Sequence, residues 1–260
     1  MNITLPFLPE RSKKNRNNGI TMMMDKGLSK TEALAFVESS AEFTDLVKFG
    51  FGTAVFAKQL NEKIQIYRDA GIEPYFGGTL FESFIVRNMF DEYRKFITGM
   101  GIHTVEVSDG SMKMNHEEKL NYVKELSKDF KVLSEVGSKV KGVEISNEEW
   151  VSAMRTELSA GAWKVIAEAR ESGTIGIYKS DGSANIELVE NIIKNVSIEN
   201  VLWEAPNKAQ QVWFINLLGA NVNLGNIAAS EVVSLEALRL GLRGDTFFNF
   251  LPEEYLDKKL

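Results

Sequence analysis

The sequence of 260 residues predicts a single-domain α/β protein with the (β/α)8 architecture of a TIM barrel. Short apolar or β-branched runs alternate with longer amphipathic runs at a spacing of about thirty residues, which is typical of the strand–helix units of such a barrel. No Pro/Gly/Ser-rich linker or change in composition divides the chain. We therefore expect a barrel over residues 19–250, an N-terminal extension over residues 1–18 and a C-terminal tail over residues 251–260. A doubly wound open sheet is the alternative.

Eight short runs have the composition of buried parallel strands. Each ends in a glycine, a proline or a charged residue. In chain order the predicted strands are Gly19–Asp25, Leu46–Gly52, Glu73–Gly78, His103–Gly110, Lys131–Gly137, Trp163–Arg170, Val201–Pro206 and Ala220–Gly225.

Amphipathic runs with apolar residues three and four positions apart lie between these strands. The first of them opens on a capping box, in which Ser29 and Glu32 satisfy free backbone N–H groups. Asn147 and Ser230 are expected to cap two later helices. The predicted helices are Ser29–Ser39, Lys58–Ala70, Glu117–Phe130, Asn147–Ala160, Lys208–Leu218 and Ser230–Leu240.

The composition restricts the chemistry that the chain can perform. It has no cysteine and only two histidines, His103 and His116, which we expect to be structural or surface residues. Thiol nucleophiles, disulfides, iron–sulfur clusters and cysteine-based zinc sites are excluded, and Ser-His-Asp triads are disfavoured. Polar chemistry must therefore rest on Asp, Glu, Lys, Arg, Tyr and backbone amides.

The charge balance bears on the partners of the protein. The net charge is −6, whereas sequence-independent nucleic-acid binding needs a basic face, so we expect no nucleic-acid partner. The basic residues Arg11, Lys13, Lys14 and Arg16 are interpreted as part of a solvated N-terminal extension. No run approaches the ~20 apolar residues of a membrane span, and the first residues lack the pattern of a signal peptide. We therefore expect a cytoplasmic protein with no membrane partner.

Charged residues recur at the carboxyl ends of the predicted strands, where barrel enzymes carry their catalytic groups. A charge embedded in an apolar strand is costly unless it is paired or binds a metal. Carboxylates suit Mg²⁺, and lysine and arginine suit phosphate and carboxylate groups. The strand-end residues are Asp25, Lys48, Glu82, Glu106, Asp109, Glu135, Lys139, Glu168, Arg170, Glu204 and Asn223.

Some of these residues have structural alternatives. Glu106 can pair with Lys48 inside the barrel, Lys139 can be a solvated loop lysine, and Glu204 can cap a turn before Ala205-Pro206. Glycine-rich loops are candidates for anion binding, because their amides and nearby hydroxyls can face a phosphate. These loops are Gly77-Gly78-Thr79, Gly225-Asn226 and Arg239–Thr246.

At these residues the sequence resembles the phosphosulfolactate synthase family. The matching segments follow one another along nearly the whole chain, and the last is the longest. They are Asp25-Lys26-Gly27, Val47–Thr53, Gly77–Glu82, Val105–Gly110, Glu135–Lys139, Arg170–Gly173, Glu204–Pro206, Val222–Ile227 and Glu231–Thr246.

The resemblance implies a (β/α)8 barrel that adds sulfite to phosphoenolpyruvate with Mg²⁺, giving (2R)-2-phospho-3-sulfolactate. It implies that Lys139 is the general acid, with Lys48 as a second catalytic lysine. Mg²⁺ ligands would come from Glu106, Glu135, Glu168, Asp25 and Asp109. Substrate-binding residues would be Arg170, Asn223, Gly225, Arg243, Gly78 and Thr79.

Two other functions remain open at this point. In one, Lys139 forms a Schiff base, as in some aldolases. In the other, the barrel is a non-catalytic or stress-associated protein, because the family also contains plant stress-associated members. In each case we expect a homo-oligomer.

Overall fold

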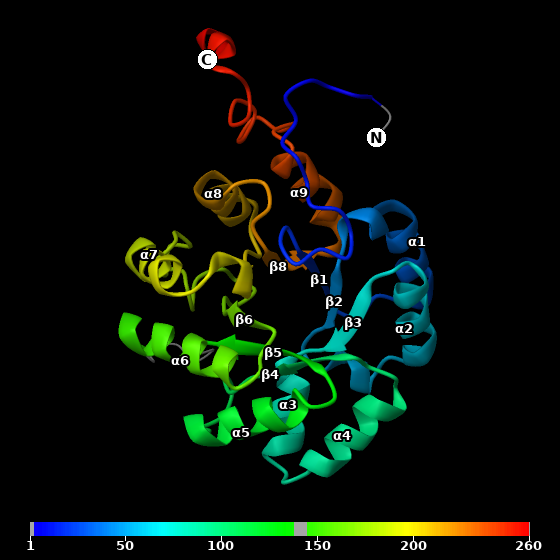
Figure 1. Cartoon of the computed structure of the whole chain (residues 1–260). Coiled ribbons are helices and arrows are strands. Elements are labelled where there is room, and N and C mark those ends of the chain that lie inside the picture. Colours follow the sequence, from blue (N-terminus) through cyan, green and yellow to red (C-terminus); the bar gives the residue numbers. More distant parts are fainter. Residues whose placement is uncertain (1–2, 138–144, 260) are drawn as a thin grey trace.

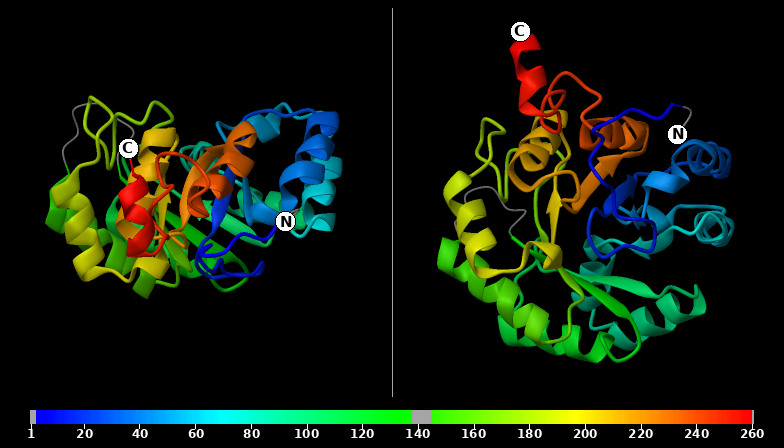
Figure 2. Two further views of the ribbon diagram at one scale, coloured as in Figure 1. Left: turned by 90° about the horizontal axis from the view of Figure 1, so that it is seen from above. Right: turned by 45° about the horizontal axis from the view of Figure 1, so that its top comes forward.

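The computed structural model describes residues 3–137 and 145–259, which form eight parallel strands surrounded by helices (Figures 1 and 2). The strand order is β3-β2-β1-β8-β7-β6-β5-β4, so that β1 and β8 are neighbours. β3 and β4, at the two ends of this sheet, also lie side by side. The sheet is thus a nearly closed barrel, which confirms the predicted (β/α)8 fold over an open sheet.

The strands agree closely with the sequence pattern. Seven of the predicted runs contain the observed strand, whereas the eighth is displaced: Ala220–Gly225 was predicted, but the strand is Leu224–Ala228. Residues 220–223 instead lie at the amino end of the barrel, where Asn221 and Asn223 bind neighbouring groups. The strands are β1 Thr21–Asp25, β2 Leu46–Phe49, β3 Glu73–Phe76, β4 Thr104–Val107, β5 Lys131–Val136, β6 Lys164–Ala167, β7 Val201–Glu204 and β8 Leu224–Ala228.

The six predicted helices are present, and three further helices were not predicted, namely α3, α4 and α7. Two of the three lie between β3 and β4, so this connection carries two helices in succession. The helices are α1 Lys30–Ser40, α2 Leu60–Asp69, α3 Gly78–Ile85, α4 Phe90–Gly99, α5 His116–Leu126, α6 Asn147–Ser159, α7 Ile186–Asn195, α8 Lys208–Leu218 and α9 Val232–Arg239.

The helix caps correct two of the predictions. The capping box of Ser29 and Glu32 is confirmed. The cap of α6, however, is Ser146 and not Asn147, because the Ser146 hydroxyl accepts the N–H of Glu149. Ser230 lies in a short 3₁₀ turn before α9 and does not cap that helix.

Side chains inside the barrel form an apolar layer with a charged layer above it. Successive residues of a strand point to opposite faces, so residues two apart lie on the same side. Leu46, Leu133 and Leu202 belong to a buried cluster inside the barrel. Lys48, Glu135 and Glu204 follow two residues later on the same strands and lie nearer the carboxyl end.

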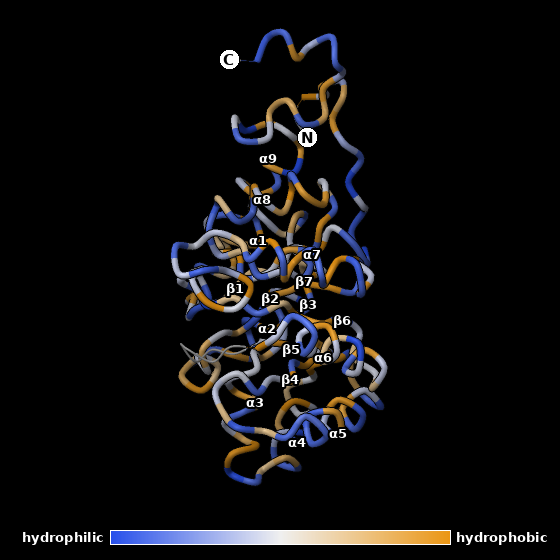
Figure 3. Tube along the Cα trace, turned by 90° about the vertical axis from the view of Figure 1, so that its left-hand side faces the viewer, coloured by the Kyte–Doolittle hydropathy of each residue, from blue (hydrophilic) through white to orange (hydrophobic). Residues whose placement is uncertain are grey.

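A second and larger apolar core lies between the sheet and the helices. In Figure 3 the outer helices carry both hydrophobic and hydrophilic residues, as expected for helices that cover a barrel. Among residues 3–137 and 145–259, no helix is long and apolar enough to cross a membrane.

The N-terminal extension packs on the barrel through three of its basic residues, so the prediction that they are solvated was wrong. Arg11 Nε lies 2.8 Å from Glu236 Oε1, and Arg16 Nε lies 2.8 Å from Asp45 Oδ1. Lys14 Nζ donates to the backbone oxygen of Ala41 at 2.5 Å. These contacts fix the extension against α9, against the loop before β2 and against the end of α1.

Candidate active site

A buried lysine surrounded by carboxylates lies near the carboxyl end of the barrel. Lys48 Nζ lies 2.9 Å from Glu106 Oε1 and 3.2 Å from Glu135 Oε2. A third carboxylate oxygen, Glu204 Oε1, lies 3.5 Å from the same nitrogen. All four side chains are buried. The sequence alternative that pairs Lys48 with Glu106 is thus present, but Lys48 contacts two further acids on other strands.

The charges of this cluster are strongly coupled. Burial alone would lower the pKa of Lys48, but Glu106, Glu135 and Glu204 together raise it well above its usual value. The ammonium group is therefore charged at neutral pH. Burial raises the pKa of Glu204 to about 7; Lys48 opposes this rise, whereas Glu135 and Glu106 reinforce it. Within residues 3–137 and 145–259, Lys48 therefore offsets only part of the effect that burial and the neighbouring acids have on the pKa of Glu204.

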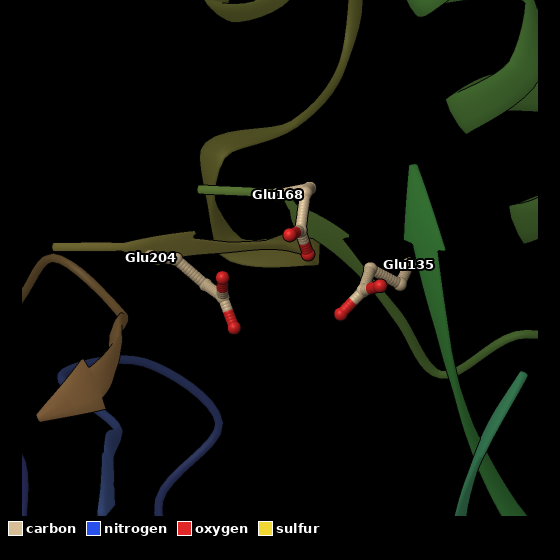
Figure 4. Close-up of side chains that lie close together, drawn as sticks. All are labelled: Glu135, Glu168 and Glu204. Carbon is tan, nitrogen blue, oxygen red and sulfur yellow. The ribbon is translucent and has the colours of Figure 1, made fainter. Parts of the chain in front are cut away.

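Three of the buried acids could hold a metal ion together. Glu135, Glu168 and Glu204 each offer a carboxylate oxygen, and these oxygens lie within 4.8 Å of one another. Their strands are consecutive in the barrel, and Figure 4 shows the three carboxylates pointing toward a common space. Mg²⁺ binds oxygen ligands at about 2.1 Å, so opposite ligands lie about 4 Å apart. The spread of the three oxygens is close to that span, and the donor set suits a hard cation.

A cavity of about 410 Å³ opens above this cluster. Its volume lies in the range of small-ligand sites, which is roughly 300–1,000 Å³. The lining residues are Met24, Lys48, Gly50, Phe51, Gly77, Thr79, Glu135, Glu168, Ala169, Arg170, Glu171, Ser172, Glu204 and Asn226.

Several of the residues predicted from the sequence meet at this cavity. Lys48, Glu135 and Glu168 lie at its base, and Arg170 and Thr79 line its walls. Arg170 is exposed, which makes its guanidinium accessible to an anion entering from solvent. The structure therefore brings together a cluster of acids and two cations from strands β2, β5, β6 and β7.

The two predicted glycine sites have other roles. The N–H of Gly78 donates to Glu106 Oε1 at 2.5 Å, so it does not face the cavity. Gly225 lies against the side chains of Met22 and Leu202 inside the barrel, and a Cβ there would lie 2.8 Å from Cε of Met22. Neither contact supports the predicted binding of an anion.

Asp25 and Asp109 lie apart from the metal candidates because their side chains face the helices. Asp25 Oδ2 lies 2.6 Å from Lys63 Nζ and accepts the Tyr67 hydroxyl at 2.8 Å. Asp109 Oδ1 lies 2.9 Å from Lys119 Nζ. Both acids thus make ion pairs outside the barrel, and the structure does not bring them to Glu135, Glu168 and Glu204.

Asn223 and Arg243 are also not brought to the cavity. The Asn223 side chain accepts the N–H of Ile20 at 3.0 Å and donates to two backbone oxygens at the amino end of the barrel. Arg243 follows α9, in a segment whose Asp245 lies 2.8 Å from Lys208 at the start of α8. Among the described residues, neither side chain lines the cavity.

Two residues at the site were not assigned to it from the sequence. Glu204 was named among the strand-end charges, with a turn cap as the alternative, but not as a metal ligand; it stands two residues after the inward-facing Leu202 and so shares its face. Asn226 adopts a left-handed backbone with φ of 58°. Its side-chain amide donates to the backbone oxygen of Ala169 at 3.2 Å and to Glu204 Oε2 at 3.4 Å. Lys139, the expected general acid, lies outside the described residues.

A nearly closed parallel barrel that carries buried acids and cations beneath a cavity at its carboxyl end is typical of (β/α)8 barrel enzymes. The profile of the family described as (2R)-phospho-3-sulfolactate synthase (ComA) matches residues 9–245. The chain belongs to this family.

Individual relatives agree with the family profile. The phosphosulfolactate synthase of Bacillus subtilis is 41% identical over 244 residues, which cover 93% of this chain and 97% of the relative. That of Methanothermobacter thermautotrophicus is 40% identical over 244 residues, covering 92% of this chain and 95% of the relative. That of Methanocaldococcus jannaschii is 42% identical over 235 residues, covering 88% and 94% respectively.

Comparison with solved structures gives the fold alone. 3-Hexulose-6-phosphate synthase from Salmonella typhimurium matches with a TM-score of 0.52 and 15% identity, over 86% of this chain and 100% of that chain. Phosphonopyruvate hydrolase in complex with oxalate and Mg²⁺ matches with a TM-score of 0.51 and 12% identity, over 85% and 79% respectively.

Proposed function

We propose that this chain catalyses the phosphosulfolactate synthase reaction, in which sulfite adds to phosphoenolpyruvate to give (2R)-2-phospho-3-sulfolactate. The observation that carries the proposal is the group of buried carboxylates, Glu135, Glu168 and Glu204, at the base of a cavity in a chain of this family. The relatives named above share the reaction in their names and cover nearly the full length of the chain.

The reaction makes demands that the residues of the cavity can meet. The sulfur lone pair of sulfite forms a bond to the methylene carbon of phosphoenolpyruvate, and the electron pair of the double bond moves toward the carboxylate. A proton is then added to the neighbouring carbon. The protein need not supply a nucleophile, because sulfite is the nucleophile, and this agrees with a chain that lacks cysteine.

Mg²⁺ is the cofactor that we propose, held by Glu135, Glu168 and Glu204. Its chemical contribution would be to neutralise negative charge that develops on the substrate carboxylate. The fit rests on hard oxygen donors and on the raised pKa of Glu204, since burial and neighbouring carboxylates leave this group short of positive charge. Glu106 is assigned to Lys48 and to the Gly78 amide instead.

The cations of the cavity have separate tasks in this proposal. Lys48 stays charged and sits against the acids at the base, where it fixes their positions and lowers the cost of bringing a negative substrate near them. Arg170 and Thr79 line the walls and are proposed to bind the phosphate or the sulfite. Lys139 stays our candidate for the acid that delivers the proton, on the basis of the family resemblance.

We also propose that the chain forms a homo-oligomer. Apolar side chains on the two terminal segments are exposed, including Ile3 (71%), Phe7 (46%) and Phe247 (48%). These segments meet through Phe7 and Tyr255, whose ring centroids lie 5.5 Å apart. Burial of such a surface against a second copy would remove apolar area from water.

The test of the function is an incubation of the purified protein with phosphoenolpyruvate, sulfite and Mg²⁺. We expect the absorbance of the enol to fall and a new phosphorus NMR signal to appear. A chelator should stop both changes, and Glu168→Gln should slow them at least a hundredfold. The control is Asn223→Ala, which alters a side chain at the opposite end of the barrel. Failure of folded, Mg²⁺-treated protein to consume phosphoenolpyruvate would contradict the proposal.

A further inference from the structure

The strand β5 loses one of its neighbours at the residue that carries a carboxylate of the site. On the β4 side, the last pair of neighbouring residues in the register is Val107 and Ser134. Glu135 follows immediately, so its backbone lies past the end of β4. A buried carbonyl oxygen needs a donor, and here that donor is Lys119 of α5, whose Nζ lies 2.6 Å from the Glu135 oxygen.

Lys119 belongs to a buried network that holds this part of β5 from outside the barrel. Its Nζ also lies 3.0 Å from Glu157 Oε1 of α6 and 2.9 Å from Asp109 Oδ1 after β4. The other oxygen of Glu157 accepts the Ser134 hydroxyl at 2.6 Å. The network therefore binds two consecutive residues of β5, Ser134 and Glu135, by hydrogen bonds and links them to Asp109 after β4.

Stability alone does not explain why charges occupy this position. The side chains of Lys119 and Glu157 are 2% and 1% exposed, and buried neighbours on the same helices, such as Val123 and Met154, are apolar. Replacement of a buried ion pair by apolar residues of similar size is often neutral or stabilising. The donor to the Glu135 oxygen, however, would be lost in such a replacement.

We infer that Lys119 and Glu157 are positioning residues for the metal site: they fix the backbone of Glu135 so that its carboxylate faces Glu168 and Glu204. The inference rests on the proposed function, in which Glu135 is a metal ligand. Among the described residues that line the cavity, neither Lys119 nor Glu157 is present, so they act through Glu135. Groups that orient metal ligands commonly change metal affinity by about 10–100-fold when they are removed.

The test is the double variant Lys119→Met with Glu157→Leu, which removes both charges and keeps similar volumes. We expect it to unfold only a few degrees below the wild type, because the buried Lys119–Glu157 pair is removed as a whole and the carboxylate that loses its lysine, Asp109, is partly exposed. We expect its dissociation constant for Mg²⁺, measured by titration calorimetry without substrate, to rise about tenfold. Its rate of product formation should saturate at a correspondingly higher Mg²⁺ concentration, with a smaller change in the maximal rate.

A matched control removes the Arg11–Glu236 ion pair near the amino end of the barrel, through Arg11→Met with Glu236→Leu. This variant should bind Mg²⁺ within about twofold of the wild type, because the pair lies far from β5's carboxyl end. A second variant, Ser134→Ala, removes only the hydroxyl bound to Glu157 and should weaken Mg²⁺ binding by about two- to threefold. It serves as the test if the double variant does not fold.

The outcomes separate this inference from the proposed function. If the wild type binds Mg²⁺ and the double variant binds it equally well, positioning by Lys119 and Glu157 is refuted while the metal site stands. If the double variant does not fold, wild-type affinity in Ser134→Ala likewise refutes it. If the wild type binds no Mg²⁺ at all, the metal site itself is refuted, and the positioning role with it.

Discussion

Removal of the Lys48 ammonium tests the electrostatics of the site most sharply. In Lys48→Met, the buried carboxylates of Glu106, Glu135 and Glu204 lose the cation that lies 2.9 to 3.5 Å from each of them. Removal of one partner from a buried ion pair costs about 3–5 kcal/mol, because the remaining charge is left uncompensated. For a chain of this size, about 2–4 °C of unfolding temperature corresponds to each kcal/mol. We expect a loss of about 6–20 °C at pH 8.

The sign of the pH dependence follows from the raised pKa of Glu204. In the wild type the pKa of Glu204 is already raised to about 7 by burial and by its acidic neighbours, with Lys48 opposing the rise. Without Lys48 the pKa of Glu204 in the folded state should rise further, while the unfolded chain keeps its ordinary value. The folded state then binds more protons, so stability falls as the pH rises through this range. The deficit of Lys48→Met should therefore shrink when the pH is lowered from 8 to 5.5.

The assay is thermal unfolding at both pH values, with and without Mg²⁺. A cation that binds only the folded state raises its stability, and the three acids should gain more from Mg²⁺ once Lys48 no longer competes. The matched control is Lys63→Met, since Lys63 is similarly buried and pairs with Asp25 outside the barrel. It should lose stability without any change in the response to Mg²⁺. Equal losses at pH 5.5 and 8, together with equal Mg²⁺ responses in the two variants, would refute the reasoning.

Three further predictions follow from the same geometry. Glu204→Gln should raise the unfolding temperature of metal-free protein at pH 8, by removal of a buried charge, yet weaken Mg²⁺ binding at least tenfold in calorimetry. Arg170→Met should raise the KM for phosphoenolpyruvate or sulfite about tenfold and leave thermal stability nearly unchanged, because the side chain is exposed. Asn223→Ala should cost about 1–3 kcal/mol in denaturant unfolding, through lost buried hydrogen bonds, with both KM values unaltered.

Much of the barrel could be predicted because strand and helix patterns differ in period. The apolar runs located the strands, and seven of them were placed within a few residues. The helices α3, α4 and α7 were missed, and capping does not separate them from the helices that were found, since α7 begins with a capping Asn185 whereas α2 has no capping side chain. The eighth strand was predicted a few residues too early in the chain, because Asn221 and Asn223 alternate with apolar residues as strand residues do. The side chains of both asparagines instead accept backbone N–H groups at the amino end of the barrel.

Whether a charged residue at a strand end reaches the cavity depends on the face of the strand to which its side chain points. Lys48, Glu135 and Glu168 all lie at the cavity, as expected for inward-facing residues near the strand ends. Asp25 also ends a strand, but it follows the inward-facing Met24 by one residue and therefore points outward to Lys63. Position at a strand end was thus insufficient to predict which residues lie at the cavity. Alternation along the strand distinguishes the two cases.

Other contacts could not be predicted from local sequence at all. The pairing of Lys119 with Glu157 joins α5 to α6, and that of Lys48 with Glu204 crosses the barrel. Such contacts depend on the packing of distant elements. The sequence nevertheless held a local signal for Glu204. It stands two residues after the apolar Leu202, which indicates an inward-facing side chain and not a turn cap before Ala205-Pro206.

The most direct test of the account is to locate the divalent ion. Crystals grown with Mn²⁺ in place of Mg²⁺ would reveal the ion by anomalous scattering. The account predicts one ion with carboxylate ligands from Glu135, Glu168 and Glu204, and its loss in Glu168→Gln. An ion bound instead at Asp25 or Asp109, or density that persists unchanged in Glu168→Gln, would contradict the assignment of the site.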